Sequence, residues 1–212
     1  MIKQTEDFVK ATLKNAESGH DWFHIDRVRK NALSIAAHFK QADKIVVELG
    51  ALLHDIADSK FHNGDETIGP KITSEYLEAL TITDAQKSGI VHIVKHISFK
   101  GGHDEDREKT LELQIVQDAD RLDAMGAIGI ARTFNYGGFK NNKIYDPEVP
   151  PQLYMTKEEY KNGVAPTINH FYEKLLLLKD LMNTTPGRLK AQQRHNFMLQ
   201  FLDQFYVEWN AE

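Results

Sequence analysis

The chain has 212 residues, 41% hydrophobic and 27% charged, which is typical of a globular protein with a sizeable core. Its net charge of −5 gives no general attraction to nucleic acid or anionic membranes, so neither a nucleic-acid polymer nor a membrane is an expected partner. There is no cysteine, which excludes disulfides and thiolate metal sites and suits a reducing compartment. The polar N-terminal residues lack the apolar core of a signal peptide, so we expect a cytoplasmic protein.

The first part of the chain shows apolar residues at helical spacing. The ranges predicted as helices are residues 2 to 17, 21 to 39, 43 to 57 and 68 to 80. Asp21 and Asp43 stand at the starts of the second and third ranges, where an aspartate side chain can accept hydrogen bonds from the first backbone N–H groups. Residues 58 to 66 are polar and are expected to form a loop over the end of the third helix.

The middle of the chain continues the helical pattern. Thr83-x-x-Gln86 is a capping-box pattern ahead of an apolar helix that extends to about Ile97. A helix from about Thr110 carries three aspartates, and residues 125 to 134 are also predicted helical. Residues 136 to 152 contain three prolines and are expected to form a lid or packing loop, because irregular segments of this length are usually functional or mobile.

The C-terminal part has two further start signals. Thr156-x-x-Glu159 is a second capping-box pattern, and a helix is expected to end near Met182. Thr185-Pro186 predicts the start of the last helix, with threonine as N-cap and proline at the first helical position. The predicted fold class is therefore all-α, with one domain over residues 1 to 212; its motif-bearing core covers about 18 to 140, and C-terminal helices at about 156 to 210 pack on it.

A candidate metal site centres on residues 50 to 58, Gly-Ala-Leu-Leu-His-Asp-Ile-Ala-Asp. His54 and Asp55 stand at the end of an apolar helical face, where an unpaired imidazole and carboxylate would be costly to bury. A metal ion resolves this conflict, because both groups are ligands and the cation offsets the buried charge. Taken alone, the pair is more often a satisfied core histidine beside a helix-end carboxylate. His24 upstream and Asp120 downstream, each in a similar apolar helical context, reverse that preference.

The resulting set of two imidazoles and two carboxylates is a candidate cage for one divalent ion. Nitrogen and oxygen ligands without sulfur suit Mn²⁺, Fe²⁺, Co²⁺, Ni²⁺ or Zn²⁺, and Mg²⁺ is also compatible. Four protein ligands on an octahedral ion leave two positions for water and a substrate oxygen. Such an arrangement is typical of a hydrolytic site.

The order His24 … His54-Asp55 … Asp120 resembles the H…HD…D signature of the HD superfamily of metal-dependent phosphohydrolases. The local sequences are also similar, namely residues 19 to 28 (Gly-His-Asp-Trp-Phe-His-Ile-Asp-Arg-Val), Leu-His-Asp-Ile-Ala-Asp at 53 to 58 and Asp-Ala-Asp-Arg-Leu-Asp-Ala at 118 to 124. The chain looks most like small bacterial stand-alone HD hydrolases, some of which are nucleoside triphosphate pyrophosphohydrolases. Mn²⁺ is the first candidate metal. The resemblance favours Asp120 over its neighbours Asp118 and Asp123, because the family's last aspartate often precedes Arg-Leu.

The same resemblance implies roles around the metal. In several HD hydrolases an acidic residue three positions after the HD aspartate assists catalysis; here it is Asp58, although the family often has glutamate there. Asp58 is alternatively a helix-end carboxylate bonded to its neighbours. Lys60 and Arg27 are candidates for binding phosphate, but Arg27 is equally expected to pair with Asp123 or Glu48. The remaining candidates near the substrate are His20 and His96.

The functional prediction is hydrolysis of a nucleotide, with a nucleoside triphosphate cut to a monophosphate and pyrophosphate. A nucleoside monophosphate phosphatase, or another phosphoester hydrolase, is the main alternative. A di-iron HD oxygenase is less favoured, because His92 and His96 share one helix instead of arriving on separate elements. A non-catalytic nucleotide-binding regulator is disfavoured by the intact ligand set. The sequence is compatible with a homodimer.

Overall fold

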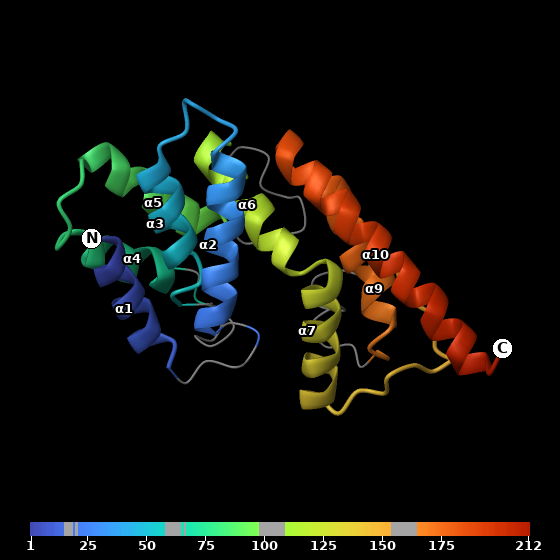
Figure 1. Ribbon diagram of the computed structural model, residues 1–212. Helices are drawn as coiled ribbons and strands as arrows, with labels where there is room; N and C mark the ends of the chain where they lie inside the picture. Colours follow the sequence, from blue (N-terminus) through green and yellow to red (C-terminus); the bar gives the residue numbers. More distant parts are fainter. Residues whose placement is uncertain (15–18, 20, 58–64, 66, 98–108, 154–164) are drawn as a thin grey trace. The chain divides into compact units, whose positions relative to one another are not determined.

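The computed structural model describes residues 1–14, 19, 21–57, 65, 67–97, 109–153 and 165–212. Every regular element in these ranges is a helix, and the all-α prediction is confirmed (Figure 1). No helix among them is long and apolar enough to cross a membrane. The Thr156-x-x-Glu159 capping box lies outside these ranges.

Contacts divide the chain into two compact units, Met1–Asp120 and Arg121–Glu212. A single domain over residues 1 to 212 stays a prediction. The N-terminal unit contains α1 (Ile2–Thr12), α2 (Trp22–Ala36), α3 (Lys44–Leu53), α4 (Ile68–Leu77) and α5 (Asp84–His96), and α6 (Leu111–Asp123) runs through the boundary. The C-terminal unit contains α7 (Gly126–Phe139), α9 (Asn169–Glu173), the 3₁₀ segment η2 (Leu175–Leu181) and α10 (Thr185–Asn210).

Helix α3 is the centre of the N-terminal unit, and it packs against α1, α2 and α5. Its residues from Leu49 to Leu53 are all buried. Gly50 allows a close approach to α5, because a Cβ built there would lie only 2.6 Å from Cδ1 of Ile93. The apolar run that precedes the HD dipeptide is therefore held rigidly in the core.

The predicted N-caps of this unit are confirmed. The Asp21 side chain accepts from His24 N–H, and the Asp43 side chain accepts from the N–H groups of Ile45 and Val46. Thr83 and Gln86 form both hydrogen bonds of the capping box that begins α5. These local signals were readable because each involves residues within one helical turn.

Four predicted helix ends are too late. Helices α1, α2 and α4 end at Thr12, Ala36 and Leu77, and α3 ends at Leu53 instead of near residue 57. After α3 the N–H of Ile56 donates to Leu53 O at 3.2 Å, three residues back. The chain therefore tightens into a turn at the HD dipeptide, so His54 and Asp55 follow the helix instead of lying within it.

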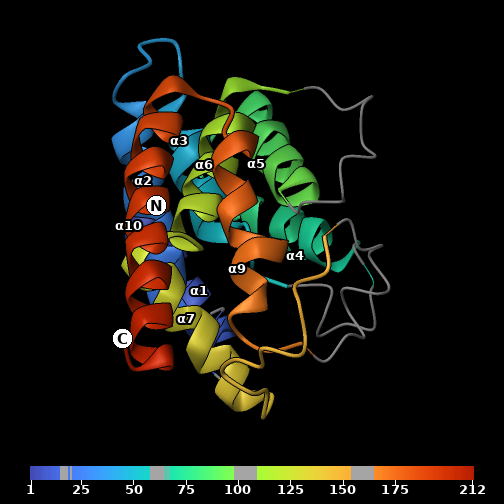
Figure 2. The same ribbon diagram turned by 90° about the vertical axis from the view of Figure 1, so that its right-hand side faces the viewer.

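In the C-terminal unit, α10 packs against α7 and η2, and α9 packs against η2 (Figure 2). Helix α7 extends to Phe139, so the irregular loop predicted from residue 136 begins later. Gly137 is a helical glycine at a close contact, since a Cβ there would lie 2.2 Å from Oγ1 of Thr167. The predicted helix to residue 182 is interrupted at Lys174, with φ −143° and ψ −57°.

The start of α10 differs from the prediction by one residue. Thr184 is the N-cap, and its side chain accepts from Gly187 N–H at 3.0 Å. Thr185 is therefore already helical. In the segment after α7, Tyr145 packs against Phe205 and Trp209 of α10, with ring centroids 5.9 and 5.0 Å apart.

Candidate metal centre

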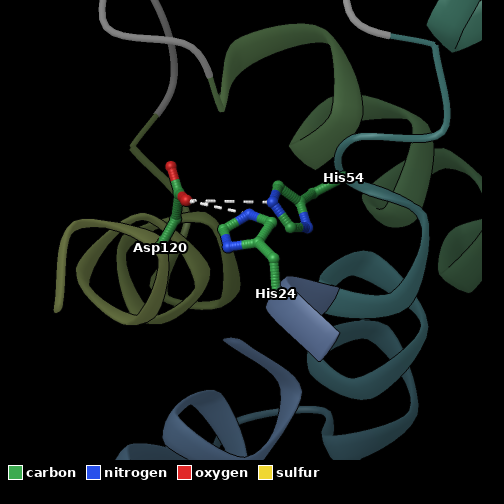
Figure 3. Close-up of side chains that lie close together, drawn as sticks. All are labelled: His24, His54 and Asp120. Carbon is green, nitrogen blue, oxygen red and sulfur yellow. Dashed lines mark ion pairs between the residues drawn. The ribbon is translucent and has the colours of Figure 1, made fainter. Parts of the chain in front are cut away.

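Three side chains with metal-binding groups meet in the N-terminal unit (Figure 3). The Nε2 atom of His24 lies 3.6 Å from Oδ1 of Asp120, and the Nε2 atom of His54 lies 3.8 Å from the same oxygen. One ligand atom from each of the three residues lies within 4.8 Å of the others. The residues come from the first turn of α2, the turn after α3 and the last turn of α6.

Local structure fixes both histidines. The backbone N–H of His24 donates to Oδ1 of Asp21 at 3.0 Å, so the cap of α2 also places this histidine. His24 is 1% exposed and His54 is 7% exposed. Their rings meet edge to face, with centroids 5.3 Å apart. Both imidazoles are therefore buried side by side.

The hydrogen bonding of His54 determines which ring nitrogen is available. Its Nδ1 atom lies 2.8 Å from the carbonyl oxygen of Ala51. Because a carbonyl only accepts hydrogen bonds, Nδ1 carries the proton, and in the neutral ring Nε2 presents a lone pair. That lone pair faces the carboxylate of Asp120. A cation placed between two such acceptors would satisfy both of them.

The spacing fits a bound divalent ion. Two ligands about 2.1 Å from a transition-metal ion are roughly 3.0 to 3.4 Å apart for right-angled or tetrahedral geometry. The two nitrogen–oxygen separations of 3.6 and 3.8 Å need only a small contraction. Holding one ring nitrogen of a ligating histidine on a backbone carbonyl is the usual way in which proteins orient such a ligand. The Asp120 side chain is 38% exposed, which leaves access to the site.

The structure places the other predicted residues as follows. Asp55 is half-buried directly after His54, but it does not belong to the group of three, and its role as a fourth ligand stays a prediction. Arg27 lies three residues beyond His24 on α2 and is half-buried. His96 is the last residue of α5, with its ring centroid 4.6 Å from that of His92. Asp58, Lys60 and His20 lie outside the described residues.

The three aspartates of α6 have different environments. Asp120 belongs to the histidine group, whereas Asp118 is fully buried elsewhere. Asp123 is 1% exposed and pairs with Arg132 of α7 at 2.8 Å. Asp123 thus has an arginine partner that follows it in the chain, and the pairing with Arg27 that the sequence suggested stays a prediction.

Two further contacts in the N-terminal unit were not foreseen from the sequence. Gln117, one turn before Asp120, donates from Nε2 to the carbonyl oxygen of His96 at 3.0 Å and ties α6 to the end of α5. Glu48, the other partner suggested for Arg27, accepts from Nε of Arg29 at 2.8 Å. Both contacts join residues distant in sequence, so no local pattern announced them.

Comparison with known proteins agrees with this geometry. A family model described as HD domain matches residues 22–125, a range that contains all four predicted ligands. The Bacillus subtilis protein YpgQ, described as uncharacterized, is 37% identical over 209 residues, which cover 96% of this chain and 92% of YpgQ.

Solved structures are also similar to this chain over nearly its whole length. The chain is 44% identical to an HD-superfamily hydrolase from Bacillus thuringiensis, with a TM-score of 0.78 and coverage of 100% and 97% of the two chains. It is 33% identical to Bacillus subtilis YpgQ solved in complex with ADP, with a TM-score of 0.76 and coverage of 98% and 97%.

Proposed function

Since this chain belongs to the HD superfamily and is a metal-dependent phosphohydrolase of that family, we propose that it hydrolyses nucleotides, cutting a nucleoside triphosphate into a monophosphate and pyrophosphate. The observation that carries the proposal is the pair of buried histidine Nε2 atoms facing one carboxylate oxygen. Support for a nucleotide substrate comes from the structure of YpgQ with ADP, a relative whose likeness covers nearly the whole chain.

The metal in this proposal is a single divalent ion, with Mn²⁺ first. His24, His54 and Asp120 would hold it, with Asp55 as the fourth ligand. When bound, such an ion polarises a phosphate oxygen and lowers the pKa of a coordinated water. Imidazole and carboxylate ligands suit Mn²⁺ and its neighbours Fe²⁺, Co²⁺, Ni²⁺ and Zn²⁺, and Mg²⁺ is the weaker fit because it favours oxygen ligands.

The protein side chains divide the remaining work. The hydrogen bond from His54 Nδ1 to Ala51 O keeps this imidazole oriented toward the site throughout the reaction. Asp58 is the proposed acid–base residue, which would take a proton from the attacking water or give one to the leaving oxygen. Lys60 and Arg27 would contact phosphate oxygens, with His20 and His96 at the edge of the substrate.

A metal-supplemented nucleotide screen tests the proposal. Metal-free protein is incubated with Mn²⁺, Co²⁺, Ni²⁺ or Mg²⁺ and with nucleoside mono-, di- and triphosphates, and the products are separated. We expect triphosphates to yield monophosphate and pyrophosphate in equal amounts, fastest with Mn²⁺.

The products also distinguish the alternatives. Release of orthophosphate from monophosphates at a higher rate would favour the phosphatase. Triphosphates that release only orthophosphate would contradict cleavage at the α–β bond. Two tightly bound irons per chain, with a visible absorption band, would indicate the oxygenase class instead.

A further inference from the structure

Two arginines from other helices contact the C-terminal end of α6, the helix that carries Asp120. The last carbonyl groups of an α-helix have no partners within the helix. Here Leu122 O accepts from Met125 N–H at 3.1 Å and also from the guanidinium of Arg194. Asp123 O accepts from Nη1 of Arg132 at 3.2 Å. Side chains of α10 and α7 therefore complete the end of α6.

Charge reinforces these hydrogen bonds. The same Nη1 atom of Arg132 lies 2.8 Å from Oδ2 of Asp123, whose side chain is 2% exposed. Burial lowers the pKa of the Arg194 guanidinium, and the nearby charge of Asp123 opposes that shift. Cations at the C-terminal end of a helix are also favoured by the helix dipole. The Asp123–Arg132–Arg194 cluster therefore fixes the last turn of α6 from two other helices.

The connection after α6 fits this cluster closely. Gly126 has a φ of 70°, a conformation that favours glycine. A Cβ built at Gly126 would lie 3.0 Å from Cγ and 3.1 Å from Cβ of Arg194. The aliphatic part of Arg194 therefore lies against the backbone where the chain leaves α6, so the arginine and this turn constrain each other.

Asp120 lies one turn before Asp123 on the same helix, and its Oδ1 atom faces His24 and His54. Metal sites tolerate errors of only about 0.2 Å in ligand distances, so a small rotation of this last turn would weaken binding. We infer that Arg132 and Arg194 are positioning residues for Asp120, which set metal affinity by holding the C-terminal turn of α6. The inference rests on the proposed metal site.

Arg188 provides a matched control. It also lies on α10, and its Nε atom donates to the carbonyl oxygen of Met182 at 3.0 Å, just after η2. Arg188 and Arg194 thus make the same kind of contact from the same helix, but Arg188 bonds to the end of η2 and Arg194 bonds to α6. A general loss of stability would affect both variants, whereas a positioning effect would follow Arg194 alone.

The experiment measures the dissociation constant for Mn²⁺ by titration calorimetry on metal-free full-length protein, without nucleotide. We expect Arg194→Met to weaken Mn²⁺ binding about tenfold, the lower end of effects seen for groups that support metal ligands. Arg188→Met is expected to stay within about twofold of wild type at equal helical content by circular dichroism. Arg194→Lys should fall between, because an ammonium group keeps the charge but loses the planar fork.

The possible results separate clearly. Arg194→Met affinity within about twofold of wild type, or equal weakening in Arg188→Met, would overturn the inference and leave the proposed function intact. Wild-type protein that binds no Mn²⁺ or other divalent ion would overturn both. Should Arg194→Met not fold, Arg194→Lys decides, with weakening of about threefold expected and unchanged affinity contradicting the inference.

Discussion

Two clusters of polar side chains, one turn apart on α6, differ in the groups that face their carboxylates. At Asp123 the carboxylate meets the guanidinium of Arg132 at 2.8 Å and lies close to that of Arg194, so the cluster contains its own counter-charges. At Asp120 the carboxylate faces two histidine Nε2 atoms, and because Nδ1 of His54 donates to Ala51 O, its Nε2 atom carries the lone pair of the neutral ring. The first cluster is complete without a ligand, whereas the second is arranged to receive a cation.

This difference teaches how to separate structural from functional carboxylates. If burial were the only criterion, the nearly inaccessible Asp123 would be a stronger candidate for a functional carboxylate than Asp120, which is 38% exposed. The discriminating feature is the hydrogen-bonding character of the neighbours. Donors beside a carboxylate indicate a structural pair, while acceptors beside it indicate a missing positive charge.

The largest expected effect is at the cluster that lacks a cation. Replacing His54 by alanine should abolish Mn²⁺ binding and hydrolysis together, because it removes an oriented ligand. Helical content should persist, since the substitution removes one hydrogen bond to a backbone carbonyl and creates no unpaired buried charge. Asp55→Ala should behave likewise if it is the fourth ligand. Metal analysis, product assays and circular dichroism check the result.

His38 supplies the control for this experiment. Its Nδ1 atom also lies near a backbone carbonyl, Ser34 O at 3.1 Å, but the side chain is exposed. His38→Ala should keep both metal and activity. Full turnover in His54→Ala or Asp55→Ala would show that the corresponding ligand assignment is wrong.

A second prediction concerns the step beyond metal binding. Asp58→Asn should retain Mn²⁺ but lower kcat by about 10²–10⁴-fold, the usual contribution of acid–base catalysis. KM should change little, since the substitution removes a proton acceptor and no phosphate contact. Steady-state kinetics and metal titration on the same sample provide the measurement. A rate within a few-fold of wild type would return Asp58 to a structural role.

The third prediction addresses the self-contained cluster. Arg132→Met leaves Asp123 buried with one of its counter-charges removed, so the metal-free protein should lose about 3 kcal/mol of unfolding free energy. His54→Ala in the other cluster should change the stability of metal-free protein far less. Urea unfolding in the presence of a chelator compares the two. Equal losses would show that the clusters do not differ in the way proposed.

Much of the fold and part of the candidate site could be predicted from the sequence. The helices and the caps at Asp21, Asp43 and Thr83 were predictable because their partners lie within one turn. The order of His24, His54 and Asp120 also predicted that they would lie together, as they do. Whether Asp55 completes the ligand set stays a prediction.

The Asp123–Arg132–Arg194 cluster was not predictable, because Arg194 is 72 residues from the Leu122 carbonyl that it contacts. Sequence spacing carries no signal for such a pair. The end of α7 was misjudged for a related reason: the glycines after Tyr136 look like a helix end, yet Gly137 serves close packing against Thr167. Tertiary contacts decided both cases.

The smallest expected effect comes from a histidine outside the metal site, whose protonation is opposed by burial. On α9, burial first and the charge of Lys174 second lower the pKa of His170 to about 3. Between that value and the ordinary 6.5 the unfolded chain binds more protons than the folded one, so stability is present above pH 6.5 and is lost as the pH falls. The full slope would be about 1.4 kcal/mol per pH unit, and the partly exposed ring should give less, of order 1 kcal/mol between pH 6.5 and 5.

His170→Gln should therefore reduce the loss of unfolding free energy as the pH falls below 6.5. Above pH 7, the unfolding free energies of the variant and of wild type should change with pH in the same way. Urea unfolding at several pH values, with a chelator present so that metal ligation does not contribute, measures the slope. His38→Gln is the matched control, because it makes the same substitution at an exposed histidine. If His170→Gln and wild type lose stability in parallel as the pH falls, burial does not keep His170 neutral in the folded protein, and the lowered pKa of this histidine is contradicted.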